Sequence, residues 1–189
     1  SSAASDVYKR QLLNTSNAVE LDVLDPAVCG TDYAIDACMW VGGVGQSGIN
    51  AIGDLLCGKQ NFSGRLVDTY CYDNASSPAI QNAYVTSYTN AAEQGLSFKG
   101  TNDEYYAVYQ EGIYVGYRYY ETRYEDVVLE NANVGSYDYA STVAFPFGYG
   151  LSYSNLSYSN LTMKEQGDSF LFTVEVSNPS NMDCLLYTS

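Results

Sequence analysis

The sequence predicts an α/β layer with a mostly parallel sheet, followed by a truncated all-β domain of the immunoglobulin-like kind. In the first part, an apolar run at residues 34–41 leads through glycines at 42–45 into residues with helical spacing. Residues 145–150 then form a turn-rich boundary, and beyond it apolar and polar side chains alternate. An immunoglobulin-like sandwich needs about seven strands over about 100 residues. Since only residues 145–183 follow, we expect two or three strands of it.

The first elements are predicted around the glycine turn. Leu12 and Leu13 resemble the end of a truncated strand, which runs into a turn at residues 14–18. Residues 34–41 are mostly apolar, which is typical of a strand of a parallel sheet buried on both faces. The following helix is predicted from the apolar spacing of Ile49, Ile52, Leu55 and Leu56. Ser47 is the expected N-cap and Gly58 the expected C′ stop.

The central region carries weaker signals. Residues 59–70 indicate a turn followed by an extended segment, and residues 71–102 indicate irregular surface structure. Residues 105–124 are dense in tyrosine and favour strands. After the boundary, the alternation of Phe170, Phe172, Val174 and Val176 with residues 171, 173 and 175 predicts a strand.

The two ends encode inverted copies of one DNA element. Residues 6–11 back-translate as GAT GTG TAT AAG AGA CAG, and residues 184–189 as TGT CTC TTA TAC ACA TCT. With one base taken from the codon of Asp183 and the last base left off, the second string is the reverse complement of the first. We therefore interpret residues 1–11 and 184–189 as scars of a transposase adaptor, and residues 12–183 as a window of a longer reading frame.

Composition limits the classes of function. A hydrophobic content of 46% is enough for a core, and a net charge of −14 argues against nucleic-acid and anionic-membrane partners. No apolar run approaches the ~18 residues of a membrane span. Outside the scar residue Cys184, the cysteines are Cys29, Cys38, Cys57 and Cys71, with no CxxC pair and no histidine in the chain. A zinc site is not expected, and Cys38 and Cys57 are predicted to be buried free thiols.

A glycine motif allows two interpretations. Residues 43–48 match G-x-G-x-x-G between a strand and a helix, and Asp68 follows at about the 20-residue distance of a dinucleotide site. However, a turn at residues 61–64 precedes Asp68 instead of a clear second strand. We favour a structural role, in which the glycines let a strand turn tightly into a helix.

Several residue types could serve glycosidic chemistry, which needs two carboxyl groups. The candidate acids by type are Asp103, Glu104, Glu111, Glu121, Glu125 and Asp126. The tyrosines that could present rings to a sugar are Tyr105, Tyr106, Tyr109, Tyr114, Tyr117, Tyr119, Tyr120 and Tyr124, although packing at a domain interface is the favoured role. The sequons at Asn14, Asn61, Asn74, Asn155 and Asn160 are best explained by chance. The chain has no G-x-S-x-G, no P-loop motif and no histidine for a triad.

Three segments, taken in order, resemble glycoside hydrolase family 3 of the β-glucosidase type. The first is DACMWVGGVGQSGINAIGDLL at residues 36–56, continued by NFSGRL at 61–66. The second is YQEGIYVGYRYY at 109–120, and the third is FPFGYGLSY at 145–153. Phe62 departs from the proline usual in the family's turn, and Cys38 and Cys57 replace ordinary apolar residues.

The resemblance implies a division of the chain and a mechanism. Residues 12–144 would be the rear part of an α/β-sandwich domain with a tyrosine-rich extension, and residues 145–183 the start of a fibronectin III-like domain. The parent would be a retaining β-glycosidase acting on a carbohydrate, a β-glucoside or oligosaccharide, without a cofactor. Its nucleophile and its acid/base would both precede residue 12. We therefore assign no catalytic, cofactor-binding or metal residue here, and expect the chain alone to be inactive; a non-catalytic carbohydrate-binding module is the main alternative.

Overall fold

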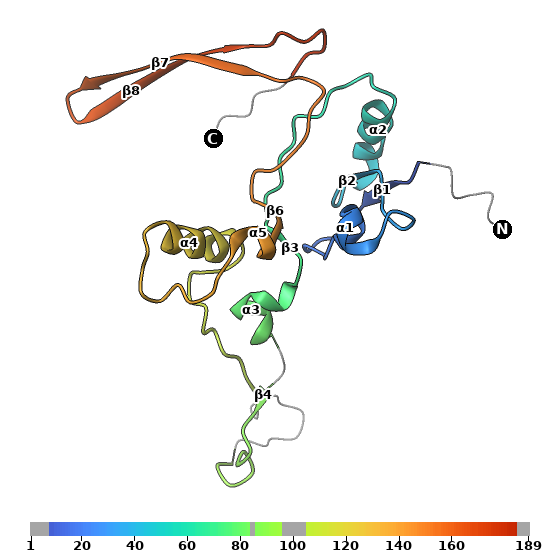
Figure 1. Cartoon of the computed structure of the whole chain (residues 1–189). Coiled ribbons are helices and arrows are strands. Elements are labelled where there is room, and N and C mark those ends of the chain that lie inside the picture. The colour runs from blue at the N-terminus through green and yellow to red at the C-terminus, as the bar shows by residue number, and fades with distance from the viewer. Residues whose placement is uncertain (1–7, 84–85, 96–104, 185–189) are drawn as a thin grey trace, which may run out of the picture. The chain divides into compact units, whose positions relative to one another are not determined.

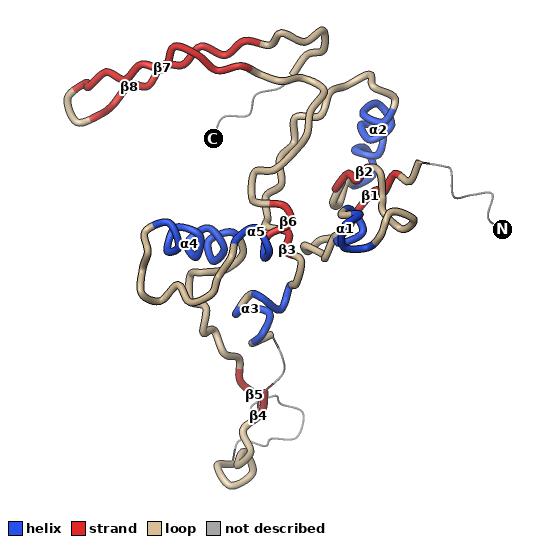
Figure 2. Tube along the Cα trace, in the orientation of Figure 1, coloured by secondary structure: helices blue, strands red, loops and turns tan. Residues whose placement is uncertain are grey.

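The computed structural model describes residues 8–83, 86–95 and 105–184, which divide into two units (Figure 1). Unit 1 contains residues 1–40 and 67–147, and unit 2 contains residues 41–66 and 148–189. Loops connect short helices and strands throughout (Figure 2). Among the described residues, no helix combines the length and the apolar character that crossing a membrane requires.

Unit 1 begins with a parallel strand pair. Strand β1 (Arg10–Leu13) pairs with β2 (Ala37–Trp40), with Leu12 opposite Met39 and Leu13 opposite Trp40. The predicted strand at 34–41 therefore exists but is shorter, and its burial on both faces is wrong, since Trp40 is 38% exposed. With one partner strand each, both strands are edges, and edge side chains reach solvent.

The other elements of unit 1 are short apart from one helix. Helix α1 (Pro26–Cys29) follows a 3-10 turn at Asp22–Leu24 and is capped by the Asp25 carboxylate, which accepts from the Ala27 N–H at 2.9 Å. The remaining elements are β3 (Tyr70–Cys71), a 3-10 turn (Asn74–Ser76), α3 (Pro78–Gln81), β4 (Thr86–Ser87), β5 (Tyr105–Tyr106), α4 (Tyr117–Val128), α5 (Tyr139–Thr142) and β6 (Val143–Phe145). β3 pairs antiparallel with β6, and β4 with β5.

Helix α4 corrects the expectation of strands over residues 105–124. Only Tyr105 and Tyr106 are in a strand, whereas the stretch from Tyr117 onward is helical. Gly116 precedes the helix with φ of 60°, a conformation that glycine adopts without strain. Tyr120 is buried in the core and Tyr119 packs against it, whereas Tyr117 and Tyr124 are exposed. The packing of this part of the helix outweighs the strand preference of tyrosine.

The core of unit 1 joins α4 to the β3–β6 pair. Cys71, Tyr120 and Val143 are buried together, and Tyr119 and Tyr139 pack against them. The Tyr120 hydroxyl also lies 2.9 Å from the Ser76 Oγ. Irregular surface structure was expected from residue 71, but residues 74–76 and 78–81 form short helices and Cys71 is a core residue.

Unit 2 contains the predicted helix and a hairpin whose second strand is the one predicted around residues 170–176. Helix α2 (Gly45–Leu56) ends before Gly58, whose φ of 72° confirms the expected stop. Its N-cap is Val44, so the expectation of a Ser47 cap is wrong: the helix already begins at Gly45, which places Ser47 in the first turn. Cys57 is the C-cap and is exposed, unlike the buried thiol predicted, whereas Cys38 is half-buried.

The hairpin consists of β7 (Ser157–Gln166) and β8 (Ser169–Ser177), paired antiparallel. Gly167 opens the two-residue loop with φ of 62°, the position where a type II′ turn takes glycine. The register shifts between Ser159 and Thr162, where Asn160 has φ of 53° and its side chain donates to Glu175 at 2.7 Å. Every residue of both strands is exposed.

Candidate functional site

The glycine-rich turn has the strand–turn–helix form that was predicted. Gly42 and Gly45 have φ of 55° and 64°, so they need the left-handed region. A Cβ at Gly43 or Gly45 would meet nothing within 4 Å, whereas one at Gly48 would lie 3.1 Å from the Val44 Cβ. Backbone conformation and the packing of one helical turn therefore explain these glycines, in line with the structural interpretation.

Asp68 has local partners in unit 1. Its Oδ1 accepts from the Thr69 N–H at 2.9 Å and would lie 3.2 Å from a Cβ placed on Gly116. Gly116 thus gives the Asp68 carboxylate room beside the start of α4. The side chain supports a turn in its own unit.

The candidate acids separate into different environments. The carboxylate of Glu121 accepts from the Tyr139 hydroxyl at 2.6 Å, and Asp126 accepts from the Asn131 amide at 2.7 Å. One oxygen of Glu111 is buried without a hydrogen-bond partner, and Glu125 is exposed on α4. Asp103 and Glu104 lie outside the described residues. In the described ranges, no group of three or more His, Cys, Asp or Glu side chains is arranged to hold a metal ion.

The candidate tyrosines also divide between core and surface. Tyr120 is 3% exposed, while Tyr109 is 79% exposed. Four ring pairs involve them: Tyr88 with Tyr106, Tyr117 with Phe147, Tyr119 with Tyr120, and Tyr124 with Tyr139. Packing within unit 1 accounts for most of these rings.

One pocket of about 390 Å³ lies between α4 and the residues around α5. Its lining is Glu121, Tyr124, Val127, Tyr137, Asp138, Tyr139 and Ala140. The Tyr124 and Tyr139 ring centroids are 4.8 Å apart and the ring planes are tilted by 50°, so the two rings pack against each other at an angle. Glu121 and Tyr124 were candidates from the sequence, whereas Tyr137, Asp138 and Tyr139 were missed.

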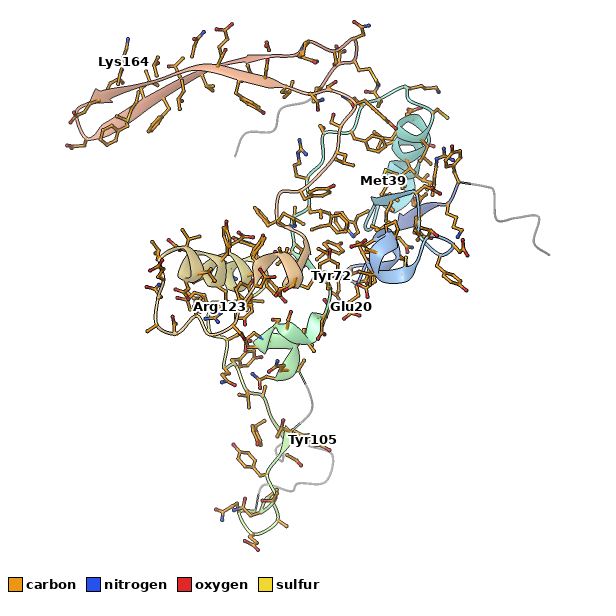
Figure 3. The ribbon with its side chains drawn as sticks, in the orientation of Figure 1. Glu20, Met39, Tyr72, Tyr105, Arg123 and Lys164 are labelled. Atoms are coloured by element: carbon orange, nitrogen blue, oxygen red, sulfur yellow. The ribbon has the colours of Figure 1, made fainter. Side chains whose placement is uncertain are left out.

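Arg123 holds the loop that completes this pocket. Its guanidinium donates to the carbonyls of Asn133 at 2.9 Å and Val134 at 2.6 Å, and lies 5.4 Å from the centre of the Tyr137 ring. Figure 3 labels this arginine on α4. Burial raises the pKa of Tyr137 to about 12, and burial followed by the Glu121 hydrogen bond raises that of Tyr139. Both phenols are therefore neutral near neutral pH.

A second arrangement, in unit 2, joins two sequence motifs. The backbone N–H of Leu66 donates to the Tyr149 carbonyl at 2.8 Å, the Gly148 N–H donates to the Leu66 carbonyl at 2.8 Å, and the Arg65 guanidinium donates to the Gly150 carbonyl. The Asn61 amide donates to Ser154 at 2.6 Å and accepts from the Tyr153 N–H at 3.0 Å. We call these contacts between residues 61–66 and 148–154 the motif clamp. It brings NFSGRL together with the GYGLSY part of the third motif, residues 148–153.

The chain is similar to several known proteins. A model described as the glycosyl hydrolase family 3 C-terminal domain matches residues 11–117. A β-glucosidase of Ruminococcus albus is 29% identical over 167 residues, which is 88% of this chain and 13% of the relative. β-Glucosidase B of Emericella nidulans is 35% identical over 116 residues, which is 61% of this chain and 11% of the relative. A β-glucosidase structure from Paenibacillus barengoltzii superposes with a TM-score of 0.60 at 28% identity, over 90% of this chain and 15% of that one.

The chain spans only 11–15% of the length of these proteins, and the similarity covers 61–90% of the chain. The family model includes the glycine-rich turn, α2 and most of the tyrosine-rich stretch up to Tyr117. The first motif and residues 109–117 of the second lie within the match to the family model, whereas the third motif at residues 145–153 lies beyond it. The chain belongs to glycosyl hydrolase family 3, is similar to β-glucosidases, and contains part of the family's C-terminal domain at residues 11–117.

Proposed function

We propose that the chain is part of a retaining β-glycosidase that hydrolyses O-glycosidic bonds of β-glucosides or oligosaccharides. Residues 12–144 would form the rear of its α/β-sandwich domain, residues 145–183 the start of a fibronectin III-like domain, and residues 1–11 and 184–189 the adaptor-derived ends. The family membership carries the proposal, because the relatives that match 61% and 88% of this chain are β-glucosidases.

The proposed role of this part is to shape and brace the catalytic cleft. A retaining mechanism needs a nucleophile and an acid/base about 5–5.5 Å apart, and we place both outside the chain. In support, Glu121 and Asp126 already bind a tyrosine hydroxyl and an asparagine amide of the same unit. The hydrogen bonds of the motif clamp join residues such as Leu66 and Gly148, which are 82 residues apart in the sequence. Contacts between segments so far apart support a bracing role.

The two-carboxylate mechanism requires no cofactor. The partner of the parent enzyme is a carbohydrate, and the net charge of −14 supports the absence of nucleic-acid and anionic-membrane partners. Glucosides are the preferred substrates, because the relatives reported above are named as β-glucosidases.

The test is to recover the DNA on both sides of residues 12–183, express the protein it encodes, and assay it with an aryl β-glucoside. We expect hydrolysis by that protein with retention of anomeric configuration, which proton NMR of the first product reports. The 189-residue chain alone should give no turnover above background. A frame without an upstream catalytic domain, inversion of configuration, or turnover by the chain alone would each contradict the proposal.

A further inference from the structure

The Asn61 side chain, in unit 2, uses its whole hydrogen-bonding capacity on residues far away in the sequence. Its Nδ2 donates to the Ser154 Oγ at 2.6 Å and to the Asp183 carbonyl at 3.2 Å. Its Oδ1 accepts from the Ser152 hydroxyl at 3.2 Å and from the Tyr153 N–H at 3.0 Å. A primary amide has two N–H donors and an oxygen with two lone pairs, so an ionised aspartate at this position would lack both donors.

Ser154 extends these contacts to the segment that follows β8. Ser154 is only 4% exposed, and its Oγ lies 2.6 Å from the Ser180 Oγ. The Ser180 hydroxyl donates to Asn178 Oδ1 at 2.7 Å, and Asn178 Nδ2 donates to the Met182 carbonyl at 2.8 Å. A continuous series of side-chain hydrogen bonds therefore connects Asn61 with residues 178–183.

The donors give this series one direction. Each serine hydroxyl has a single hydrogen. Because Ser180 donates to Asn178, Ser154 is the donor between the two serines, and Ser154 in turn accepts from the Asn61 amide. The other acceptor near both hydroxyls, the Met182 carbonyl, is more distant, at 3.1 Å from Ser154 and 3.0 Å from Ser180. Hydrogen bonds in such a series polarise one another, so losing the first donor weakens those that follow.

We infer that Asn61, Ser154, Ser180 and Asn178 form a latch that holds residues 178–183 against the loop before β7. Asn61 is the positioning residue of the latch, because it supplies the first donor. The segments on both sides of the β7–β8 hairpin meet in this network, so opening the latch should release the segment after β8 while the two strands stay paired. The latch involves no carbohydrate and is independent of the proposed function.

The test is hydrogen exchange of the whole 189-residue chain in dilute solution, with Asn61→Asp as the variant. The Ser180 N–H donates to Asn178 Oδ1 at 3.1 Å, and the Met182 N–H donates to the Ser180 Oγ at 3.4 Å. At neutral pH the new carboxylate has no donor, so we expect both amides to exchange roughly fivefold faster than in the wild type. At about pH 3 the carboxyl group is protonated and can donate again, so both rates should return to those of the wild type at that pH.

Asn155→Asp is the matched control for charge. It adds the same carboxylate at an exposed position next to Ser154, and it should leave both reporter amides unchanged at neutral pH. The other ionisable groups around the latch belong to Arg65, Tyr153 and Asp183. All variants contain these groups, so comparison with the wild type at each pH removes the effect of their titration.

Three results would overturn the inference. The first is equal exchange of the Ser180 amide in the wild type, Asn61→Asp and Asn155→Asp at neutral pH. The second is fast exchange in Asn61→Asp that persists at about pH 3, because the lost donor would then not be its cause. The third is an equal acceleration of the Cys57 amide, which bonds to the Gly53 carbonyl at 3.0 Å at the end of α2, since Asn61 would then support unit 2 as a whole. None of these readouts depends on glycosidase activity.

Discussion

At the residue scale, the atoms that surround Gly150 explain why this position is a glycine. A Cβ at Gly150 would lie 2.6 Å from the carbonyl oxygen of Gly64 and 3.0 Å from the Arg65 Cδ. Because backbone occupies that space, the motif clamp admits no side chain there. Gly53, inside α2, differs: a Cβ would meet nothing within 4 Å.

Gly150→Ala should therefore destabilise the motif clamp. An added methyl group in a filled site lowers stability by about 1–3 kcal/mol. Hydrogen exchange of the Leu66 and Gly148 amides, which form the clamp's backbone bonds, measures the effect. The same substitution at Gly53 should slow exchange in α2 or leave it unchanged, since alanine favours helix over glycine by about 1 kcal/mol. Equal exchange at Leu66 in the wild type and Gly150→Ala would show that the contact does not hold the clamp.

One buried phenol, Tyr120, and two half-buried phenols, Tyr137 and Tyr139, make unit 1 sensitive to alkaline pH. Burial raises the pKa of Tyr137 to about 12 and also raises those of Tyr120 and Tyr139, whereas tyrosines in an unfolded chain titrate near about 10. The unfolded chain thus releases these protons first, so stability present below about pH 10 is lost as the pH rises toward about 12. A spectrophotometric titration of tyrosinate should show a late group among the 20 tyrosines. A single step near pH 10 with circular dichroism unchanged would contradict this.

At the element scale, the sequence predicted an element correctly where a single local property, backbone conformation or side-chain period, decided its structure. The glycines around residues 42–48 and Gly58 predicted a turn and a helix end, and the alternation around Phe170–Val176 predicted a strand, because backbone conformation and period decide those cases. α4 was missed because strand preference and helical spacing competed in one tyrosine-rich run, and core packing decided. The pocket residues Tyr137 to Tyr139 were missed because a loop brings them to α4, and no spacing in the sequence encodes that contact.

The loop after α4 should depend on the forked geometry of Arg123. Lysine keeps the charge but cannot donate in the same plane to both Asn133 and Val134, nor stack as well on Tyr137. We expect Arg123→Lys to speed hydrogen exchange of the Val134 and Tyr137 amides by about tenfold, a loss of about 1–2 kcal/mol. Arg118→Lys, at an exposed position of the same helix, is the control and should leave these amides unchanged. If the Val134 and Tyr137 amides remain protected in Arg123→Lys, the backbone turns of the loop, and not the Arg123 side chain, keep it ordered.

At the scale of the whole molecule, much apolar surface faces solvent. On β8, Phe170 is 58% and Phe172 is 63% exposed, and Met163, the register partner of Phe172, is 59% exposed. The β7–β8 hairpin has two outer strand edges, which invite pairing with other chains. We expect the chain to aggregate when expressed alone. Phe172→Lys should reduce the aggregated fraction, measured by size-exclusion chromatography, more than Thr173→Lys does. Thr173→Lys is the control, because it adds the same charge to the other face of β8. A monodisperse wild type would refute the expectation.

The two units should also differ in resistance to proteolysis. In unit 1, Cys71, Tyr120 and Val143 form a buried cluster, whereas each residue of β7 and β8 is exposed and a two-stranded hairpin alone is marginal in water. Local opening therefore requires little free energy in residues 150–183 and more around α4. Brief digestion with chymotrypsin should cut after Phe170 or Phe172 before it cuts after Tyr120, because cleavage follows the population of open chain. Mass spectrometry of the early products identifies the cleavage sites. If α4 is cut while residues 150–183 are spared, the hairpin is stabilised by contacts beyond its own two strands.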